Sequence, residues 1–245
     1  MKKKIAIIGA GIGGLTLANL LQNNSNFDFI IYEKNETLNL DEGFGIQLAV
    51  NSISILNQIG FSSLNKSEFF NPAKLDFYSN QDKICDLDLT QFNTDTEKYT
   101  TLKRSTLIKF LKDKLFSNLI RFNKTIKEVE QNKNNIKINF TDGEIDEVDY
   151  LVVSDGVFSS TKSIIENKNY RPNYYGAIAI RTIVDRKNVK DFDKNNISLL
   201  MSSNAHAVLY AINEKERNLV TTIRSKIKNS EKVNNLDFIK TILKN

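Results

Sequence analysis

The sequence predicts an α/β fold whose N-terminal part contains a parallel sheet and whose C-terminal part contains a partly antiparallel sheet. The first prediction rests on two continuous apolar segments, 4–8 and 27–32, which are separated by a glycine-rich turn and a helical segment over 12–23. Such uninterrupted apolar strands are typical of a parallel sheet that is covered on both faces. The second prediction rests on four strand-like segments at 176–184, 197–201, 207–212 and 219–224.

Further elements are expected between these two groups. Apolar residues at helical spacing, followed by Gly60, predict a helix over 50–59. A second helix is expected from a Ser105 cap to about residue 119, and a last one over 234–243. The remaining strands are expected at 75–78, 84–89, 126–129, 136–140 and 150–153.

Composition excludes several classes of protein. The 245 residues are 40% hydrophobic and 26% charged, which argues against disorder and coiled coil. With one cysteine, Cys85, and one histidine, His206, we expect no disulfide framework and no metal site. No apolar run predicts a membrane span. Basic residues are mixed with acidic ones, so the net charge of +5 does not predict a nucleic-acid partner.

The N-terminus allows two interpretations. Lys2, Lys3 and Lys4 followed by an apolar stretch resemble a signal peptide. Glycines interrupt that stretch, however, and no small-residue cleavage site follows it. We therefore favour a strand, turn and helix at this end, and we expect a cytoplasmic protein.

The glycine-rich turn predicts a dinucleotide site. Gly9, Gly11 and Gly14 match the motif G-x-G-x-x-G, and the acid Glu33 ends the second strand about 20 residues later. In this motif the first glycine permits a tight turn, the second lets the backbone approach a pyrophosphate, and the third lets the helix pack on the strand. The pyrophosphate faces the helix N-terminus. Glu33 accepts hydrogen bonds from a ribose and repels a 2′-phosphate, although the turn alone does not separate FAD from NAD.

Five segments together resemble one family. They are IAIIGAGIGGLTLANLL (5–21), GFGIQLAVNSISILNQIG (43–60), LKRSTLIKFL (102–111), DYLVVSDGVFSSTK (149–162) and YYGAIAIR (174–181). In this order they resemble segments of the single-component FAD-dependent aromatic hydroxylases, the family of para-hydroxybenzoate and salicylate hydroxylases. Each segment is moderately specific, and the set is specific.

The resemblance implies a Rossmann-like FAD-binding domain with an interleaved, partly antiparallel β-sheet substrate domain that is incomplete here. The implied domains are 1–165, with a small strand insertion near 72–92, and 166–245. The implied function is hydroxylation of an aromatic or phenol-like small molecule with FAD as cofactor, NAD(P)H as reductant and O2. The residues expected to bind the cofactor are Gly9, Ala10, Gly11, Gly13, Gly14, Glu33, Lys34, Gly45, Arg104, Ile126, Asp155 and Gly156.

The chain also departs from the family. Val50 stands where the family usually has proline, and Lys162 replaces an arginine. The family's later G-D-A-A-H-like segment is absent, because the sequence contains no Gly-Asp dipeptide. A truncated, non-catalytic FAD- or nucleotide-binding remnant, or the N-terminal part of a split flavoprotein, is therefore an alternative. A related flavin reductase or halogenase is another, although the absence of tryptophan argues against a halogenase.

Catalytic residues are less well defined by the sequence. Gln47 lies in the stretch expected near the flavin. His206 and Tyr210 alternate on one expected strand and therefore share one side of it, where both can face one cavity. A Ser-His-Asp hydrolase is not favoured, because the G-x-S-x-G elbow is missing.

Overall fold

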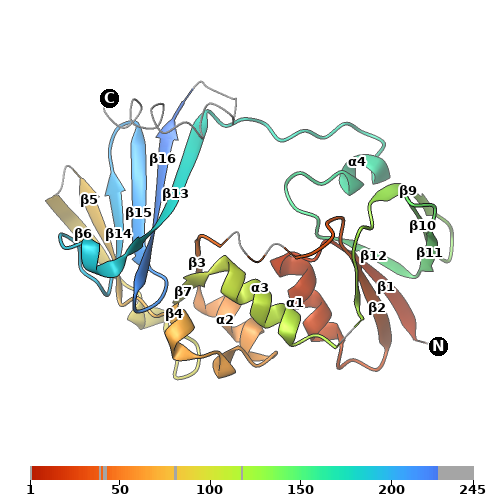
Figure 1. The fold of residues 1–245 in the computed structure, drawn as a ribbon, viewed down its shortest axis with the longest axis horizontal. Coiled ribbons are helices and arrows are strands. Elements are labelled where there is room, and N and C mark those ends of the chain that lie inside the picture. The colour runs from red at the N-terminus through yellow and green to blue at the C-terminus, as the bar shows by residue number, and fades with distance from the viewer. Residues whose placement is uncertain (1, 39, 41–42, 80–81, 117, 226–245) are drawn as a thin grey trace.

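The structure is a computed structural model that describes residues 2–38, 40, 43–79, 82–116 and 118–225. Strands and helices form two parts, with the N-terminal sheet on one side and the large C-terminal sheet on the other (Figure 1). The helix expected over 234–243 lies outside the described residues.

A four-stranded parallel sheet forms the centre of the N-terminal part. Its strand order is β12-β1-β2-β8, and every pair is parallel, as the continuous apolar segments predict. The strands are β1 (Lys3–Ile8), β2 (Phe27–Tyr32), β8 (Ile120–Arg121) and β12 (Tyr150–Val153). The end of β1 therefore lies between the ends of β2 and β12, which places three loops beside one another.

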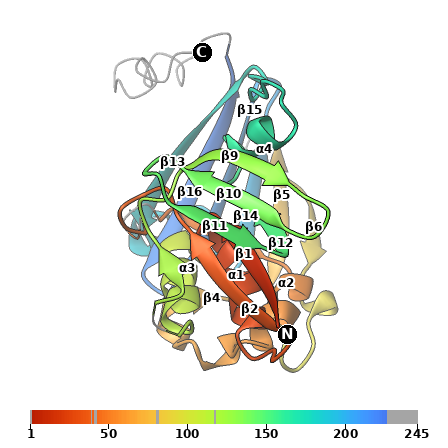
Figure 2. The same ribbon diagram turned by 90° about the vertical axis from the view of Figure 1, so that its right-hand side faces the viewer.

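Both faces of this sheet are covered. On one face α1 (Ile12–Leu21) and α3 (Arg104–Asp113) pack in a core that includes Leu15 and Leu107. On the other face lies an antiparallel sheet of β9 (Ile126–Gln131), β10 (Ile136–Phe140) and β11 (Ile145–Val148), as Figure 2 shows. Burial on both faces explains why β1 is apolar throughout its second half.

A small antiparallel sheet connects the two parts. It has the order β3-β7-β4 and consists of β3 (Gly45–Leu48), β4 (Phe69–Phe70) and β7 (Thr100–Lys103). Near it lie α2 (Val50–Asn57) and the short 3-10 helices η1 (Phe61–Ser63), η2 (Lys66–Glu68) and η3 (Thr90–Phe92). Gly60 has a φ of +85° and separates α2 from η1, as the glycine stop predicts for the helix over 50–59.

The C-terminal part is a six-stranded sheet of order β13-β16-β15-β14-β5-β6. Its strands are β5 (Lys74–Ser79), β6 (Asp82–Asp88), β13 (Ala177–Asp185), β14 (Ile197–Met201), β15 (Ala205–Ala211) and β16 (Glu216–Arg224), with η4 (Arg186–Asn188) after β13. All neighbouring strands are antiparallel except β5 and β14. The strand pair near 72–92, expected as an insertion in 1–165, thus completes the sheet formed by strands of 166–225.

Helix ends differ from the expectation. Helix α3 begins at Arg104, so Ser105 lies inside its first turn and does not cap it, and the helix ends at Asp113 instead of continuing to residue 119. The chain must leave the helix early because Ile120 and Arg121 pair with β2. Helices α1 and α3 have ten residues each, and no helix in the described part of the chain has the length and apolarity needed to cross a membrane.

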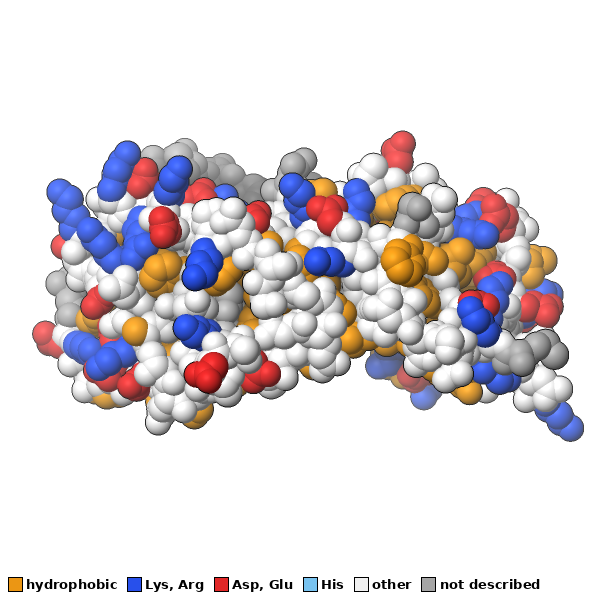
Figure 3. All heavy atoms as spheres, turned by 90° about the horizontal axis from the view of Figure 1, so that it is seen from below, with side chains coloured by type: hydrophobic (Ala, Val, Ile, Leu, Met, Phe, Trp, Pro, Cys, Tyr) orange, Lys and Arg blue, Asp and Glu red, His pale blue; other side chains and the backbone are white. Residues whose placement is uncertain are grey.

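The face of the molecule shown in Figure 3 spans both parts. Lysine and arginine side chains are interspersed on it with aspartate and glutamate. Charge on this face is therefore mixed in sign, in agreement with the even distribution of charged residues along the sequence.

Candidate functional site

The glycine turn after β1 divides into packing glycines and open glycines. Gly9 has a φ of +98°, and a Cβ there would lie 2.7 Å from the Ser154 carbonyl oxygen. A Cβ on Gly14 would lie 2.0 Å from the carbonyl oxygen of Gly9, so only glycine lets α1 approach the turn. A Cβ on Gly11 or Gly13 would meet nothing within 4 Å. Open space therefore faces the N-terminus of α1, where a pyrophosphate is favoured.

Glu33 is fixed beside this turn. Its side chain is 8% exposed, and its carboxylate accepts the Ala10 backbone N–H at 2.9 Å and the Asn35 backbone N–H at 3.0 Å. These bonds use one lone pair on each oxygen. Since a carboxylate accepts about four hydrogen bonds, Glu33 keeps capacity for a ribose diol.

A cavity of about 250 Å³ joins the turn, Glu33 and the loop after β12. Of the residues expected to bind the cofactor, its lining contains Gly9, Gly11, Glu33, Lys34, Arg104, Ile126, Asp155 and Gly156. Ala10, Gly13 and Gly14 belong to the turn but not to the lining. The structure therefore gathers residues from five distant stretches of sequence around one cavity.

Gly45 lies elsewhere. Its backbone N–H donates to the Asn218 side chain at 2.8 Å, and a Cβ there would lie 2.7 Å from both Asn218 and Ile212. In this structure the glycine serves the close approach of β3 to the large sheet, and Gly45 is not part of the cavity lining.

Arg104 brings a positive charge to the cavity. Its backbone N–H donates to the Phe44 carbonyl at 3.0 Å, which anchors the start of α3. Arg104 is half-buried, and its guanidinium forms no hydrogen bond or ion pair with the residues that the structure describes. A guanidinium with free donors in a cavity fits an anionic group such as a phosphate.

Asp155 lines the cavity from the end of β12. Thr161 Oγ1 donates to Asp155 Oδ2 at 2.8 Å, whereas Asp155 Oδ1 is buried and has no hydrogen-bond partner among the described residues. Asp155 also lines a neighbouring cavity of about 520 Å³ with Gly156 and Lys162. A buried carboxylate oxygen without a partner indicates a missing donor.

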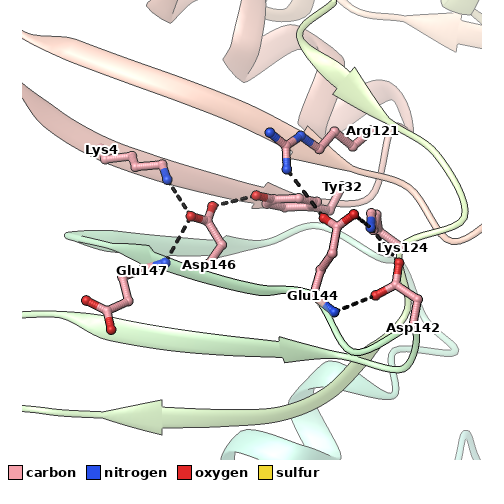
Figure 4. A network of polar contacts seen from close by, with 8 residues as sticks. All are labelled: Lys4, Tyr32, Arg121, Lys124, Asp142, Glu144, Asp146 and Glu147. Atoms are coloured by element: carbon pink, nitrogen blue, oxygen red, sulfur yellow. Dashed lines mark hydrogen bonds and ion pairs between the residues drawn. The ribbon is translucent and has the colours of Figure 1, made fainter.

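A polar network that sequence analysis missed closes one side of the cavity. Lys124 is 9% exposed, and its ammonium pairs with Asp142 at 2.5 Å and Glu144 at 2.7 Å (Figure 4). Hydrogen bonds with these two carboxylates raise the pKa of Lys124. Because its charge is already paired, Lys124 is not free to bind a phosphate. Nothing in the sequence indicates that Lys124 pairs with Asp142 and Glu144.

The same network fixes the covering sheet to β1 and β2. Asp146 on β11 accepts hydrogen bonds from Lys4 and from the Tyr32 hydroxyl (Figure 4). Burial would raise the pKa of Asp146, but the bonds from Lys4 and Tyr32 outweigh it and lower the pKa. These contacts hold the sheet that contributes Ile126 to the cavity.

Two of the three candidate catalytic residues come together. Gln47 Oε1 accepts the Tyr99 hydroxyl at 2.8 Å, and the Gln47 side chain also hydrogen-bonds with Tyr210. Burial raises the pKa of Tyr210 to about 12, against the opposing effects of the Arg181 charge and the bond with Gln47. Tyr210 is only 3% exposed whereas Gln47 is exposed, so Gln47 is the member of this pair that a ligand can reach. Tyr99 had no signal in the sequence.

His206 is separate from this cluster. It is exposed and lines a different cavity of about 230 Å³, which does not include Tyr210. Alternation does place both side chains on one side of β15, but Tyr210 points into a core with Ile197 and Ile212. The expectation that both face one cavity is therefore not met. Among the described residues no cluster of His, Cys, Asp and Glu could hold a metal ion.

The residues around the 250 Å³ cavity fit an adenine dinucleotide. The open helix N-terminus and Arg104 suit a pyrophosphate, and Glu33 suits a ribose. The unpaired Asp155 oxygen requires a further donor. Together these features define a dinucleotide-binding domain of the Rossmann-like type.

Comparison with known proteins specifies the family. The family model described as "FAD binding domain" matches residues 2–245, so the chain belongs to this family of FAD-binding proteins. The predicted cofactor, FAD, is thereby confirmed.

Two relatives that are similar to the chain are named as monooxygenases. The chain is 25% identical over 189 residues to 6-hydroxynicotinate 3-monooxygenase of Bordetella bronchiseptica, covering 74% of this chain and 48% of the relative. It is 25% identical over 217 residues to 3-amino-4-hydroxybenzoate 2-monooxygenase PtmB3 of Streptomyces platensis, covering 86% and 54%. The chain thus spans about half the length of these curated relatives.

The fold is also shared. Klebsiella pneumoniae HpxO complexed with FAD and uric acid superposes with a TM-score of 0.79 at 18% identity, covering 93% of this chain and 58% of that one. A salicylate hydroxylase substrate complex gives a TM-score of 0.74 at 17% identity, covering 92% and 56%. The predicted fold class is confirmed.

Proposed function

We propose that the protein acts as an FAD-dependent monooxygenase that hydroxylates an aromatic or phenol-like small molecule with NAD(P)H and O2. The cavity between the glycine turn, Glu33, Arg104 and Asp155 carries the proposal, because it supplies one group for each polar part of a dinucleotide. The relatives support the aromatic substrate class, since their names specify hydroxynicotinate and aminohydroxybenzoate.

The division of labour follows from the cofactor. Bound FAD supplies the redox and oxygen-transfer chemistry, and the protein supplies position, polarity and exclusion of water. The glycine turn and Arg104 bind the diphosphate, while Glu33 orients the ribose. We assign the Gln47 side chain on β3 to substrate contact, because it is polar and exposed and the Tyr99 hydroxyl fixes its position.

The division into a cofactor part, 1–165, and a substrate part, 166–245, belongs to this proposal, with β5 and β6 added to the second part. Because NAD(P)H is an intracellular reductant, we place the reaction in the cytoplasm.

Two measurements on the chain test this function. The purified chain is incubated with FAD, passed through gel filtration and examined for retained flavin absorbance. NAD(P)H oxidation is then followed with and without hydroxybenzoates and hydroxypyridines, and the organic product is identified. We expect retained flavin and oxidation that rises with an aromatic compound. Retained flavin without hydroxylated product contradicts the monooxygenase and supports the cofactor-binding remnant, whereas a colourless chain contradicts both.

A further inference from the structure

Thr161 lies beside the cofactor cavity but is not among the residues assigned to cofactor binding or substrate contact. It is the first residue of α4 (Thr161–Ile165), is 2% exposed and lines the cavity together with Gly9 and Glu33. Its hydroxyl donates to Asp155 Oδ2 at 2.8 Å across the loop that contains Gly156. The pair thus closes the loop between residues 155 and 161 at one end of the cavity.

The local structure does not need this hydroxyl for a cap. Ser159 Oγ accepts the Lys162 backbone N–H at 3.1 Å at the start of α4. Ser154 Oγ donates to the Ile8 carbonyl at 2.8 Å and secures the end of β12. Two other hydroxyls therefore hold the two ends of the loop, and the Thr161 hydroxyl bonds to the Asp155 carboxylate.

The bond with Thr161 determines what the Asp155 carboxylate can do. A carboxylate rotates about its Cβ–Cγ bond, and a donor on one oxygen selects one orientation. With Oδ2 engaged, Oδ1 is left as a buried acceptor without a partner among the described residues. A phosphate at this point would be repelled by the negative charge, whereas an alcohol hydroxyl supplies the missing donor.

The position of Asp155 is consistent with a sugar hydroxyl. Glu33 follows β2 and Asp155 follows β12, on opposite sides of β1, whose end carries the glycine turn. A dinucleotide with its diphosphate at the turn has polyol groups on both sides of that diphosphate. Glu33 therefore serves one polyol and Asp155 is placed for a second hydroxyl contact.

We propose that Thr161 is a positioning residue of the FAD site, whose hydroxyl orients Asp155 to accept a hydrogen bond from a cofactor hydroxyl. The inference rests on the FAD-binding function and deepens it. Thr161 itself touches Asp155 and acts through it.

The test measures FAD dissociation constants of the full chain by flavin fluorescence. Thr161→Val removes the hydroxyl at nearly constant shape, Thr161→Ser keeps it, and Thr161→Ala is a second hydroxyl-free variant should valine not pack. We expect Thr161→Val to weaken FAD binding roughly tenfold and Thr161→Ser to stay within about twofold of the wild type. Thermal unfolding without FAD checks that each variant folds like the wild type.

A double-mutant cycle separates positioning from a structural effect. If Thr161 acts through Asp155, Thr161→Val causes no further loss in an Asp155→Ala background. Equal losses in both backgrounds, or wild-type affinity in Thr161→Val, overturn the inference and leave the FAD site intact. A wild-type chain that binds no FAD overturns the site and the inference together.

A second ligand, ADP, shows which part of the cofactor supplies the hydroxyl that bonds to Asp155. ADP contains the adenosine ribose but lacks the ribityl chain of FAD. A tenfold loss for both FAD and ADP assigns the contact to the ribose, and a loss for FAD alone assigns it to the ribityl chain. Both results support an alcohol donor to Asp155.

Discussion

Glu33 connects the protein's own turn with the ligand. Its carboxylate binds the backbone of Ala10 and Asn35, so the position of the acid is set before any ribose arrives. Such preorganisation reduces the entropy lost on binding. Gly9 and Gly14 contribute in another way, because they permit close approaches of the backbone that no side chain allows.

Replacing Glu33 by alanine is expected to weaken FAD binding at least tenfold. Hydrogen bonds to a charged group contribute about 1.5–3 kcal/mol each, and the variant loses those to the ribose. The dissociation constant is measured by flavin fluorescence, with unfolding of the FAD-free protein followed in parallel because two backbone partners are also lost. Glu36→Ala, an exposed acid three residues away, is the matched control. Unchanged affinity in Glu33→Ala would remove this acid from the site.

The two helical glycines of the turn predict opposite effects. Gly14→Ala places a Cβ 2.0 Å from the Gly9 carbonyl oxygen, so α1 must move, and we expect a loss of about 1–3 kcal/mol in the free energy of unfolding. Gly13→Ala enters open space in a helix and is expected to be neutral or to stabilise by up to about 1 kcal/mol. Urea unfolding of the FAD-free chain measures both. Equal effects would contradict the packing role of Gly14.

At the scale of elements, one covering sheet is held by charge as well as by apolar packing. The sheet β9–β11 contacts the parallel sheet through Ile138, Phe140 and Val148. At its edge Asp146 joins Lys4 of β1 and Tyr32 of β2 (Figure 4). Asp146 thus connects β11 of the covering sheet with two neighbouring strands of the parallel sheet, β1 and β2.

This junction predicts loss of stability in acid. The pKa of Asp146 is lower in the folded protein than the usual value of about 3.9. A lowered folded-state pKa means that the stabilisation is complete above the unfolded pKa and is lost as the pH falls through the folded pKa. We therefore expect stability to decline below about pH 4, and Asp146→Asn to lower stability at pH 7 and flatten that decline. Urea midpoints from pH 2.5 to 7 measure this, with exposed Asp95→Asn as the control. Parallel curves for the wild type and Asp146→Asn would refute the assignment.

At the scale of the whole molecule, the two parts meet through β3, β7 and the large sheet. The Gly45 backbone binds the Asn218 side chain, and the Thr101 hydroxyl donates to the Ala211 carbonyl at 2.6 Å. Lys103 pairs with Glu216 at 2.7 Å on the same border. These contacts join chain segments more than 100 residues apart.

The border predicts a stability effect far from the cofactor cavity. A Cβ on Gly45 would lie 2.7 Å from two buried neighbours, so Gly45→Ala is expected to cost about 1–3 kcal/mol in unfolding free energy. FAD affinity per folded molecule should stay within about twofold, because Gly45 does not line the cavity. Urea unfolding is compared with that of Gly13→Ala, which adds the same methyl group to open space, and the FAD titration is compared with that of the wild type. A large loss of FAD affinity with an unchanged free energy of unfolding would instead show that Gly45 belongs to the cofactor site.

The sequence alone determined the order strand, glycine turn, helix, strand and acid, which predicts a dinucleotide-binding fold, and the set of five matching segments indicated FAD. These features are local: apolar runs specify buried strands, and the steric demands of Gly9 and Gly14 leave a signature within six residues. Tertiary structure decided the contacts made over long separations, such as Thr161 against the Asp155 carboxylate in the cavity, Lys124 with Asp142, and Tyr99 with Gln47. It also decided that β5 and β6 join the large sheet, because strand pairing depends on complementary edges and faces that form only when distant segments pack together.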